Sequence, residues 1–87
     1  MTQIGGSIEE MHQLRAALER EAHTVAQLAS NVSSQVDGTT WTGPAADRFR
    51  AQWDGEFRPV LTQLQQALST YSQEVARHAE GLMRAGG

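Results

Sequence analysis

The sequence predicts an all-α protein, a helix-turn-helix hairpin of two long antiparallel helices. On both sides of the midpoint, apolar residues recur at steps of three, four or seven, as they do along one face of an α-helix. Between the two series stand Gly38, Gly43 and Pro44, which are typical of the end of one helix and the start of the next. A single hairpin domain, residues 1–87, is the expected organisation.

The first helix is expected at about residues 8–37. Ser7 and Glu10 have the spacing of a capping box, in which the Ser7 hydroxyl accepts a hydrogen bond from the backbone N–H of Glu10. The apolar series that follows consists of Ile8, Met11, Leu14, Leu18, Val25, Leu28, Val32 and Val36.

The second helix is expected at about residues 44–83, with Pro44 at its first position. Gly55 and Pro59 predict a kink near residues 55–59, because proline removes a helical hydrogen bond. We expect the helix to bend there and not to end, because the apolar side chains on either side of Pro59 would stay on one face. Those side chains are Trp53, Phe57, Val60 and Leu64.

The turn at residues 38–43 carries the tripeptide Trp41-Thr42-Gly43. Gly38 is expected in the left-handed conformation that ends a helix. Two interpretations of Trp41 stay open: its ring covers the closed end of the hairpin, or it is exposed for recognition by a partner.

Folding back at this turn is expected to place Leu28 near Trp53 and Leu18 near Val60. Each helix then has one neighbour, so half of each apolar stripe stays exposed, and without Cys no disulfide can compensate. We therefore expect dimerisation into a four-helix bundle, with the aromatic residues near the kink, Phe49, Trp53 and Phe57, buried. The expected core and dimer stripe comprises Met11, Leu14, Leu18, Val25, Leu28, Val32, Phe49, Trp53, Phe57, Val60, Leu64, Leu68, Tyr71 and Val75.

Composition argues against several classes of partner. The net charge is −3, and the seven basic residues, all Arg, are scattered along the chain, which argues against nucleic acid as a partner.

No apolar run reaches the roughly 18 residues of a membrane span, and residues 1–6 lack the basic flank and apolar core of a signal peptide. Residues 1–6 and 84–87 are expected to fray.

Neither catalysis nor metal binding is expected. His12, His23 and His78 lack the convergent spacing of a metal site and are interpreted as surface or interface residues. No nucleophile elbow or phosphate-binding loop is present. No cofactor and no small-molecule substrate are therefore expected.

The Trp41-Thr42-Gly43 turn between two capped amphipathic helices, in a chain of 87 residues without Cys, resembles the WXG family of the ESX or type VII secretion system. The resemblance covers the whole chain. It implies a hairpin that pairs with itself or with a sister protein and leaves the cytoplasm folded, without a signal peptide, through a secretion ATPase. It also implies an origin in actinobacteria or Gram-positive relatives.

In this family, Trp and Gly of the turn lie beside a Tyr-x-x-x-Asp/Glu motif at the C-terminal end of the partner chain, and together they form an export signal. Here Tyr71 is followed by an acid after three residues, at Glu74, one position early. The resemblance therefore assigns Trp41 and Gly43 to the export signal and leaves Tyr71 and Glu74 as an imperfect tail motif. A heterodimer is somewhat favoured over a homodimer.

The leading interpretation is a secreted, non-enzymatic interaction protein. One alternative is a cytosolic chaperone or adaptor that holds a larger secreted toxin through the same apolar stripe. Another is a membrane-active protein whose hairpin opens at low pH, with the three histidines as triggers.

Overall fold

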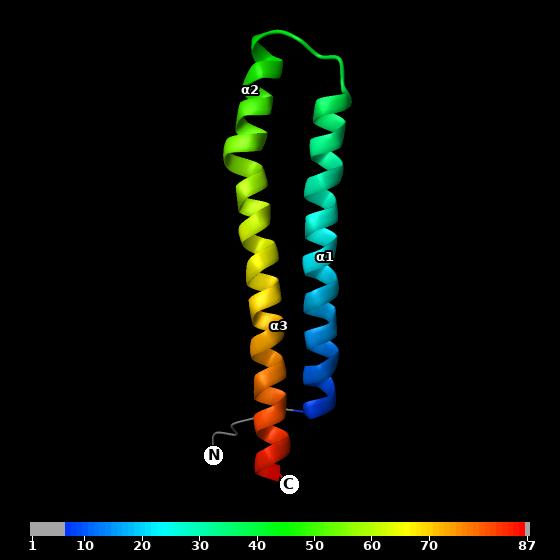
Figure 1. The fold of residues 1–87 in the computed structure, drawn as a ribbon, viewed down its shortest axis with the longest axis vertical. Helices are drawn as coiled ribbons and strands as arrows, with labels where there is room; N and C mark the ends of the chain where they lie inside the picture. The colour runs from blue at the N-terminus through cyan, green and yellow to red at the C-terminus, as the bar shows by residue number, and fades with distance from the viewer. Residues whose placement is uncertain (1–6, 87) are drawn as a thin grey trace.

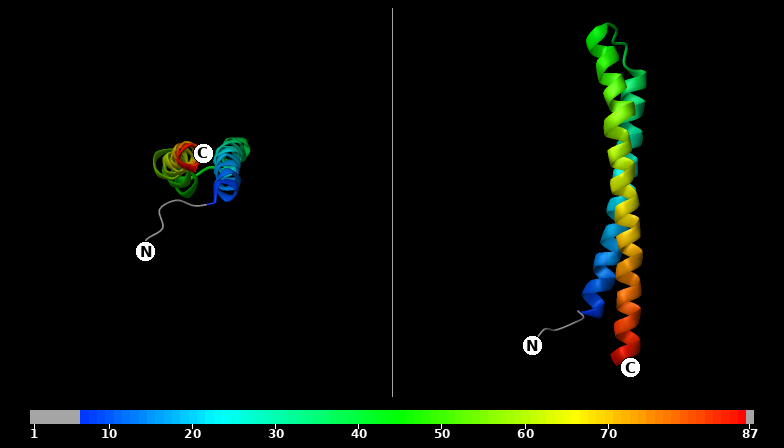
Figure 2. Two further views of the ribbon diagram at one scale, coloured as in Figure 1. Left: turned by 90° about the horizontal axis from the view of Figure 1, so that it is seen from below. Right: turned by 90° about the vertical axis from the view of Figure 1, so that its left-hand side faces the viewer.

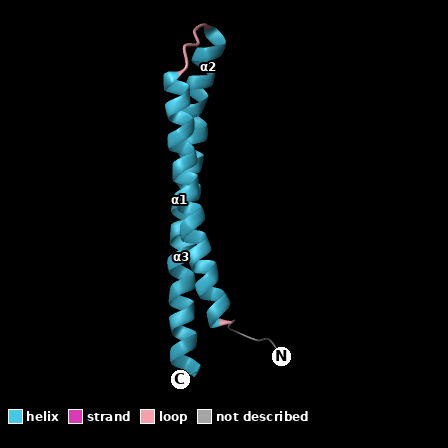
Figure 3. Ribbon diagram, turned by 90° about the vertical axis from the view of Figure 1, so that its right-hand side faces the viewer, coloured by secondary structure: helices cyan, strands magenta, loops and turns pink. Residues whose placement is uncertain are grey.

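A computed structural model describes residues 7–86 as two long antiparallel rods joined by loop 39–43 (Figure 1). The first rod is α1 (Ile8–Gly38). The second rod runs without interruption through α2 (Pro44–Gln52), the π-helical turn η1 (Trp53–Phe57) and α3 (Arg58–Gly86). The described part of the chain contains no strand, which confirms the all-α hairpin (Figure 3).

The second rod extends beyond its expected end. Residues 84–86, expected to fray, continue α3. Residues 1–6 and Gly87 were also expected to fray, and they lie outside the residues that the structure describes.

The hairpin is a single layer of two helices. Viewed along its length, the described part of the chain shows one rod beside the other (Figure 2). Its dimensions are 64 × 22 × 16 Å and its radius of gyration is 19.2 Å, whereas a compact domain of this length has about 12 Å. Such a layer cannot enclose an interior core.

The rods touch mainly through small side chains. The buried residues are Ala22, Ala46, Ser72 and Ala79, together with Trp53. Around them, partly buried residues at steps of three or four complete the contact between α1 and α3. We call this set the inner row: Arg15, Leu18, Ala22, Val25, Ala29, Ser33 and Val36 on α1, and Leu61, Gln65, Leu68, Ser72, Val75, Ala79 and Leu82 on α3.

Two polar contacts across the rods fix their register. The Trp53 indole N–H donates to the Ser33 hydroxyl at 2.9 Å. Near the other end, the Ser72 hydroxyl donates to a carboxylate oxygen of Glu19 at 3.2 Å and to the Arg15 carbonyl at 3.4 Å.

The expected pairing of the rods was wrong by more than one helical turn. Trp53 lies against Ser33 and not against Leu28, which is five residues further from the loop. The same register places Val60 well away from Leu18. The helix ends do not cause the difference, because α1 ends and α2 begins within one residue of the expected positions. The observed register is instead the one that allows the Trp53–Ser33 hydrogen bond and the hydrogen bonds of Ser72 across the rods.

Candidate functional site

The glycine of the Trp41-Thr42-Gly43 turn has a backbone conformation that suits glycine alone. Gly43 has φ 116° and ψ 175°, and it is the N-cap of α2. Its carbonyl accepts a hydrogen bond from the Asp47 N–H at 3.0 Å, and Pro44 follows at the start of α2. Gly38, expected in the left-handed conformation, instead closes α1, and the extended residue Thr39 is its C-cap. The prediction for Gly38 was therefore wrong, and the required glycine is Gly43.

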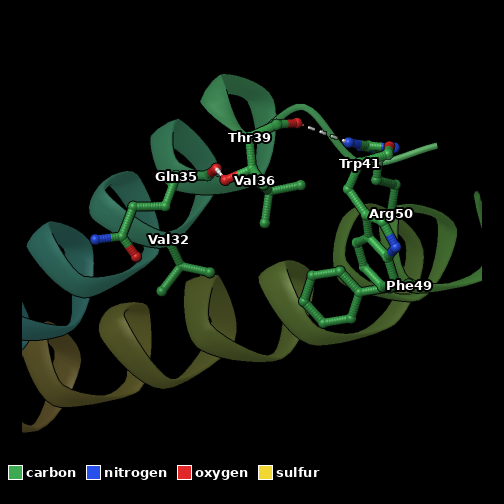
Figure 4. A pocket seen from close by; sticks show the side chains of 7 residues that line it. All are labelled: Val32, Gln35, Val36, Thr39, Trp41, Phe49 and Arg50. Atoms are coloured by element: carbon green, nitrogen blue, oxygen red, sulfur yellow. Dashed lines mark hydrogen bonds between the residues drawn. The ribbon is translucent and has the colours of Figure 1, made fainter. Parts of the chain in front are cut away.

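Arg50 fastens the loop to the second rod. One guanidinium nitrogen donates to the Trp41 carbonyl at 2.8 Å and the other donates to the Thr39 carbonyl at 3.2 Å (Figure 4). The Thr39 hydroxyl in turn donates to the Gln35 carbonyl in α1 at 2.6 Å. The loop is thus connected to both rods by hydrogen bonds, and Trp41 is held in a defined position.

This role of Arg50 was not predicted from the sequence. The available signal was its position, four residues after Ala46 and three before Trp53, both of which are buried. A helix pattern places an apolar residue at such a position. An arginine at this position of the helix indicates nearby backbone carbonyls, to which its guanidinium can donate hydrogen bonds.

Trp41 is half-exposed at the tip of the hairpin. Its ring centroid lies 6.1 Å from that of Phe49, with an angle of 44° between the rings, and 44% of Trp41 is exposed. The two rings border a shallow pocket of about 220 Å³ (Figure 4). The ring therefore packs on one side and offers its other side to solvent. The pocket is lined by Val32, Gln35, Val36, Thr39, Trp41, Phe49 and Arg50.

The π-helical turn η1 carries the chain past Pro59. The Arg58 N–H donates to the Trp53 carbonyl, five residues back, where an α-helix would use the carbonyl four residues back. Pro59 has no N–H to donate. The turn thus contains one extra residue, which rotates the helix that follows by about 100° relative to a continuous α-helix.

This rotation separates residues that were expected to share one face. Trp53 is 7% exposed and packs between the rods, whereas Phe57 is 45% exposed and Val60 is 59% exposed. Phe49 is exposed as well. The expectation that the stripe keeps its phase across Pro59 was therefore wrong. Phe49 and Phe57 are exposed in the single hairpin, and their burial in a four-helix bundle stays a prediction. The inner row continues instead from Leu61, one position later.

The displaced apolar residues form a second row on each rod. On α3 they each precede an inner-row residue by one position, as Leu64 precedes Gln65 and Tyr71 precedes Ser72. On α1, Leu14 and Leu28 have the same relation to the inner row. One position is about 100° of rotation, and in two antiparallel helices the same rotation leads to the same side of the layer. We call this side the apolar face; its exposed large residues are Leu14, Leu28, Phe57, Val60, Leu64 and Tyr71.

The other side of the layer is mostly polar. It carries the residues that follow the inner row by one position, such as His23 and Ser30 on α1 and Thr62, Gln66 and Gln73 on α3. The hairpin is therefore amphipathic as a whole, with one apolar face and one polar face.

The tail motif lies far from the loop within the chain. Tyr71 is exposed on the apolar face, and the Glu74 carboxylate forms an ion pair with Arg77 at 2.6 Å. At 1.5 Å per residue, Tyr71 is about 40 Å from the start of α2. The two parts of the expected export signal are not brought together by the fold of a single chain.

The remaining candidate chemistry gives no site. His12, His23 and His78 are exposed, and within residues 7–86 no three potential ligands of the His, Cys, Asp or Glu type are grouped for a metal ion. None of the described helices has the length and apolar character that crossing a bilayer requires.

Comparison with known proteins identifies the chain. A family model described as "WXG100: Proteins of 100 residues with WXG" matches residues 3–86, nearly the whole chain. No curated protein and no solved structure shows significant similarity to this chain. The match spans both rods and the Trp41-Thr42-Gly43 turn between them. The chain belongs to the WXG100 family, the family of ESX or type VII secretion substrates.

Proposed function

We propose that this protein, as a single domain of residues 1–87, is exported as a folded dimer by the ESX secretion system and acts by protein–protein interaction, without catalysis. Membership of the WXG100 family implies a small secreted protein of type VII secretion. We propose three further properties that family membership alone does not show. They are the pairing, the recognition by the secretion ATPase and the non-enzymatic role.

The observation that carries the pairing is the apolar face. The hairpin exposes 6582 Å², whereas a globular protein of its mass, 9.5 kDa, exposes about 5,000 Å². The excess is about 1,500 Å², more than the roughly 800 Å² that each partner buries in a stable interface of standard size. Large apolar side chains on both rods contribute to it, and they lie on one side of the layer.

The opposite character of the two sides limits the assembly. An apolar face on one side and a polar face on the other suit one partner layer and leave the polar side in water. Two hairpins packed through their apolar faces make a four-helix bundle, with either a second copy or a sister hairpin as the partner.

An antiparallel arrangement of the two hairpins would also bring the two parts of the export signal closer together than they lie within one chain. The loop of one chain would then lie near the C-terminal end of α3 in the other. Trp41 and Gly43 are the proposed recognition residues at that end, and Tyr71 and Glu74 are the imperfect tail motif. The fastening of the loop by Arg50 supports this role, because a rigid, half-exposed aromatic ring binds with a small loss of conformational entropy.

Export with and without the secretion ATPase tests the proposal. The protein should appear in the culture supernatant only when the ATPase is present. Trp41→Arg should abolish export and leave the helical circular dichroism signal intact, because half of the ring is exposed and the loop is held through backbone carbonyls. Export of Trp41→Arg at the normal level would reject the recognition role. Retention of the native protein in the cytoplasm would favour the chaperone or adaptor role.

A further inference from the structure

We propose that the apolar face is built for a different helical hairpin, one that presents an arginine or lysine at its centre, and not for a second copy of this chain. The inference rests on the proposed function, since it concerns the partner of the same face. It is carried by a carboxylate, that of Glu21, in the middle of the apolar row of α1.

Glu21 lies in line with the two exposed leucines of α1. Leu14, Glu21 and Leu28 are spaced by seven residues, which is close to two helical turns, so the three side chains point the same way. The corresponding row on the second rod, Phe57, Leu64 and Tyr71, has the same spacing and carries no acidic or basic residue until His78, seven residues after Tyr71. Glu74 lies on the same side and has its own ion pair, with Arg77. A partner that covers the leucines therefore covers Glu21 as well.

The hairpin itself provides little compensation for this carboxylate. The Glu21 side chain is 59% exposed, and its nearest cation is the exposed guanidinium of Arg20 at 3.8 Å. Arg20 is the adjacent residue and points about 100° around the helix, away from the apolar face. The facing rod offers no cation, because residues 59–76 include no Arg, Lys or His. Once covered, Glu21 needs a cation from the partner.

A second copy would provide a carboxylate where a cation is needed. Glu21 lies close to the middle of α1, which spans Ile8–Gly38. In an antiparallel twofold dimer centred on the hairpin, residues near the middle of α1 approach their own counterparts across the axis. The two Glu21 carboxylates would then lie near each other while losing water, and like charges in that setting oppose association. An arginine or lysine there would instead form a charge-assisted hydrogen bond.

Replacing the carboxylate tests the inference on the full-length chain alone. Glu21→Leu should lower the dissociation constant of the homodimer at least about tenfold, measured by sedimentation equilibrium. Glu80→Leu is the matched control: it removes the same charge on the polar side, at the position after inner-row residue Ala79, and should leave self-association unchanged. Circular dichroism establishes that each variant is helical.

Mixing two variants supplies the missing cation without knowledge of the natural partner. Glu21→Arg should associate weakly with itself, because two guanidinium groups then meet. An equimolar mixture of native chain and Glu21→Arg should form mixed dimers, resolved by mass in native mass spectrometry, at lower concentration than either chain alone.

The outcomes separate this inference from the proposed function. If the native chain dimerises as tightly as Glu21→Leu, the claim that the apolar face disfavours a second copy is wrong. The proposed pairing through the apolar face would still hold. If Glu21→Leu dimerises tightly but the native chain and Glu21→Arg form no mixed dimers, the claim that the partner presents a cation is wrong. If the native chain, Glu21→Leu and the mixture all remain monomeric, pairing through the apolar face fails, and this inference with it.

Discussion

The indole N–H of Trp53 and the hydroxyl of Ser33 join the two rods by a 2.9 Å hydrogen bond just below the loop. Trp53 is the one large buried side chain among the described residues, and its N–H has no other protein partner there. The remaining buried positions carry alanine or serine. The bond thus combines the largest buried surface of the hairpin with a polar contact that specifies which residues face each other.

Ser33→Ala should lower the free energy of unfolding by about 1–2 kcal/mol, because it leaves a buried donor without an acceptor. Urea denaturation at one fixed protein concentration measures the change. Ser34→Ala is the control, since Ser34 is exposed and the substitution has the same effect on helix propensity. Equal unfolding free energies for the two variants would show that the Trp53 bond does not stabilise the hairpin.

Gly43→Ala should destabilise the protein by about 1–3 kcal/mol through backbone strain, because a side chain is disfavoured at φ 116°. No atom lies within 4 Å of the position that a Cβ would occupy, so steric overlap does not contribute. Gly38→Ala, at the end of α1, should be neutral or stabilising by up to about 1 kcal/mol. Thermal denaturation compares the two, and a Gly43→Ala protein as stable as the native chain would contradict the strain.

The sequence predicted the all-α hairpin because its apolar spacing and the Gly and Pro residues of the turn are local signals. It was harder to predict which residues of the second rod pack against α1. Val60, Leu64 and Tyr71 recur at steps of three, four or seven, and so do Leu61, Leu68 and Val75, one position away. Spacing alone cannot tell which set meets α1. The choice depends on the extra residue in η1, which is a response to Pro59 that no periodicity records.

The loop shows a similar limit. Its tryptophan and glycine were identified from the sequence as the candidate recognition residues, and that role stays a proposal. The bonds of Arg50 to the carbonyls of Trp41 and Thr39 depend on how the loop folds back over the start of the second rod. Contacts of a side chain with backbone atoms nine and eleven residues earlier leave no periodic signal.

Arg50→Ala should free the loop. The amide protons of residues 39–42 should exchange with solvent at least several-fold faster, because two charge-assisted hydrogen bonds are lost. Hydrogen–deuterium exchange measures this effect, and Arg48→Ala, an exposed neighbour, is the control. Arg50→Lys should restore part of the protection, because one ammonium group cannot match the planar fork that reaches both carbonyls. Unchanged exchange in Arg50→Ala would mean that the loop is held by the packing of Trp41 on Phe49.

Deleting Glu56 should remove the extra residue of the π-helical turn and convert it into ordinary α-helix, without changing which side of α3 faces α1. Leu61 would then follow Trp53 by seven residues, close to two helical turns, so Leu61 would still face α1 and Val60 would stay on the apolar face. We expect the helical content and the association through the apolar face to remain, measured with Glu21→Leu as the background. Deleting both Gly55 and Glu56 should instead rotate α3 by about 100° relative to α2 and weaken the association at least about tenfold. Equal association of the single and the double deletion variants would show that the number of residues in η1 does not determine which side chains the hairpin presents.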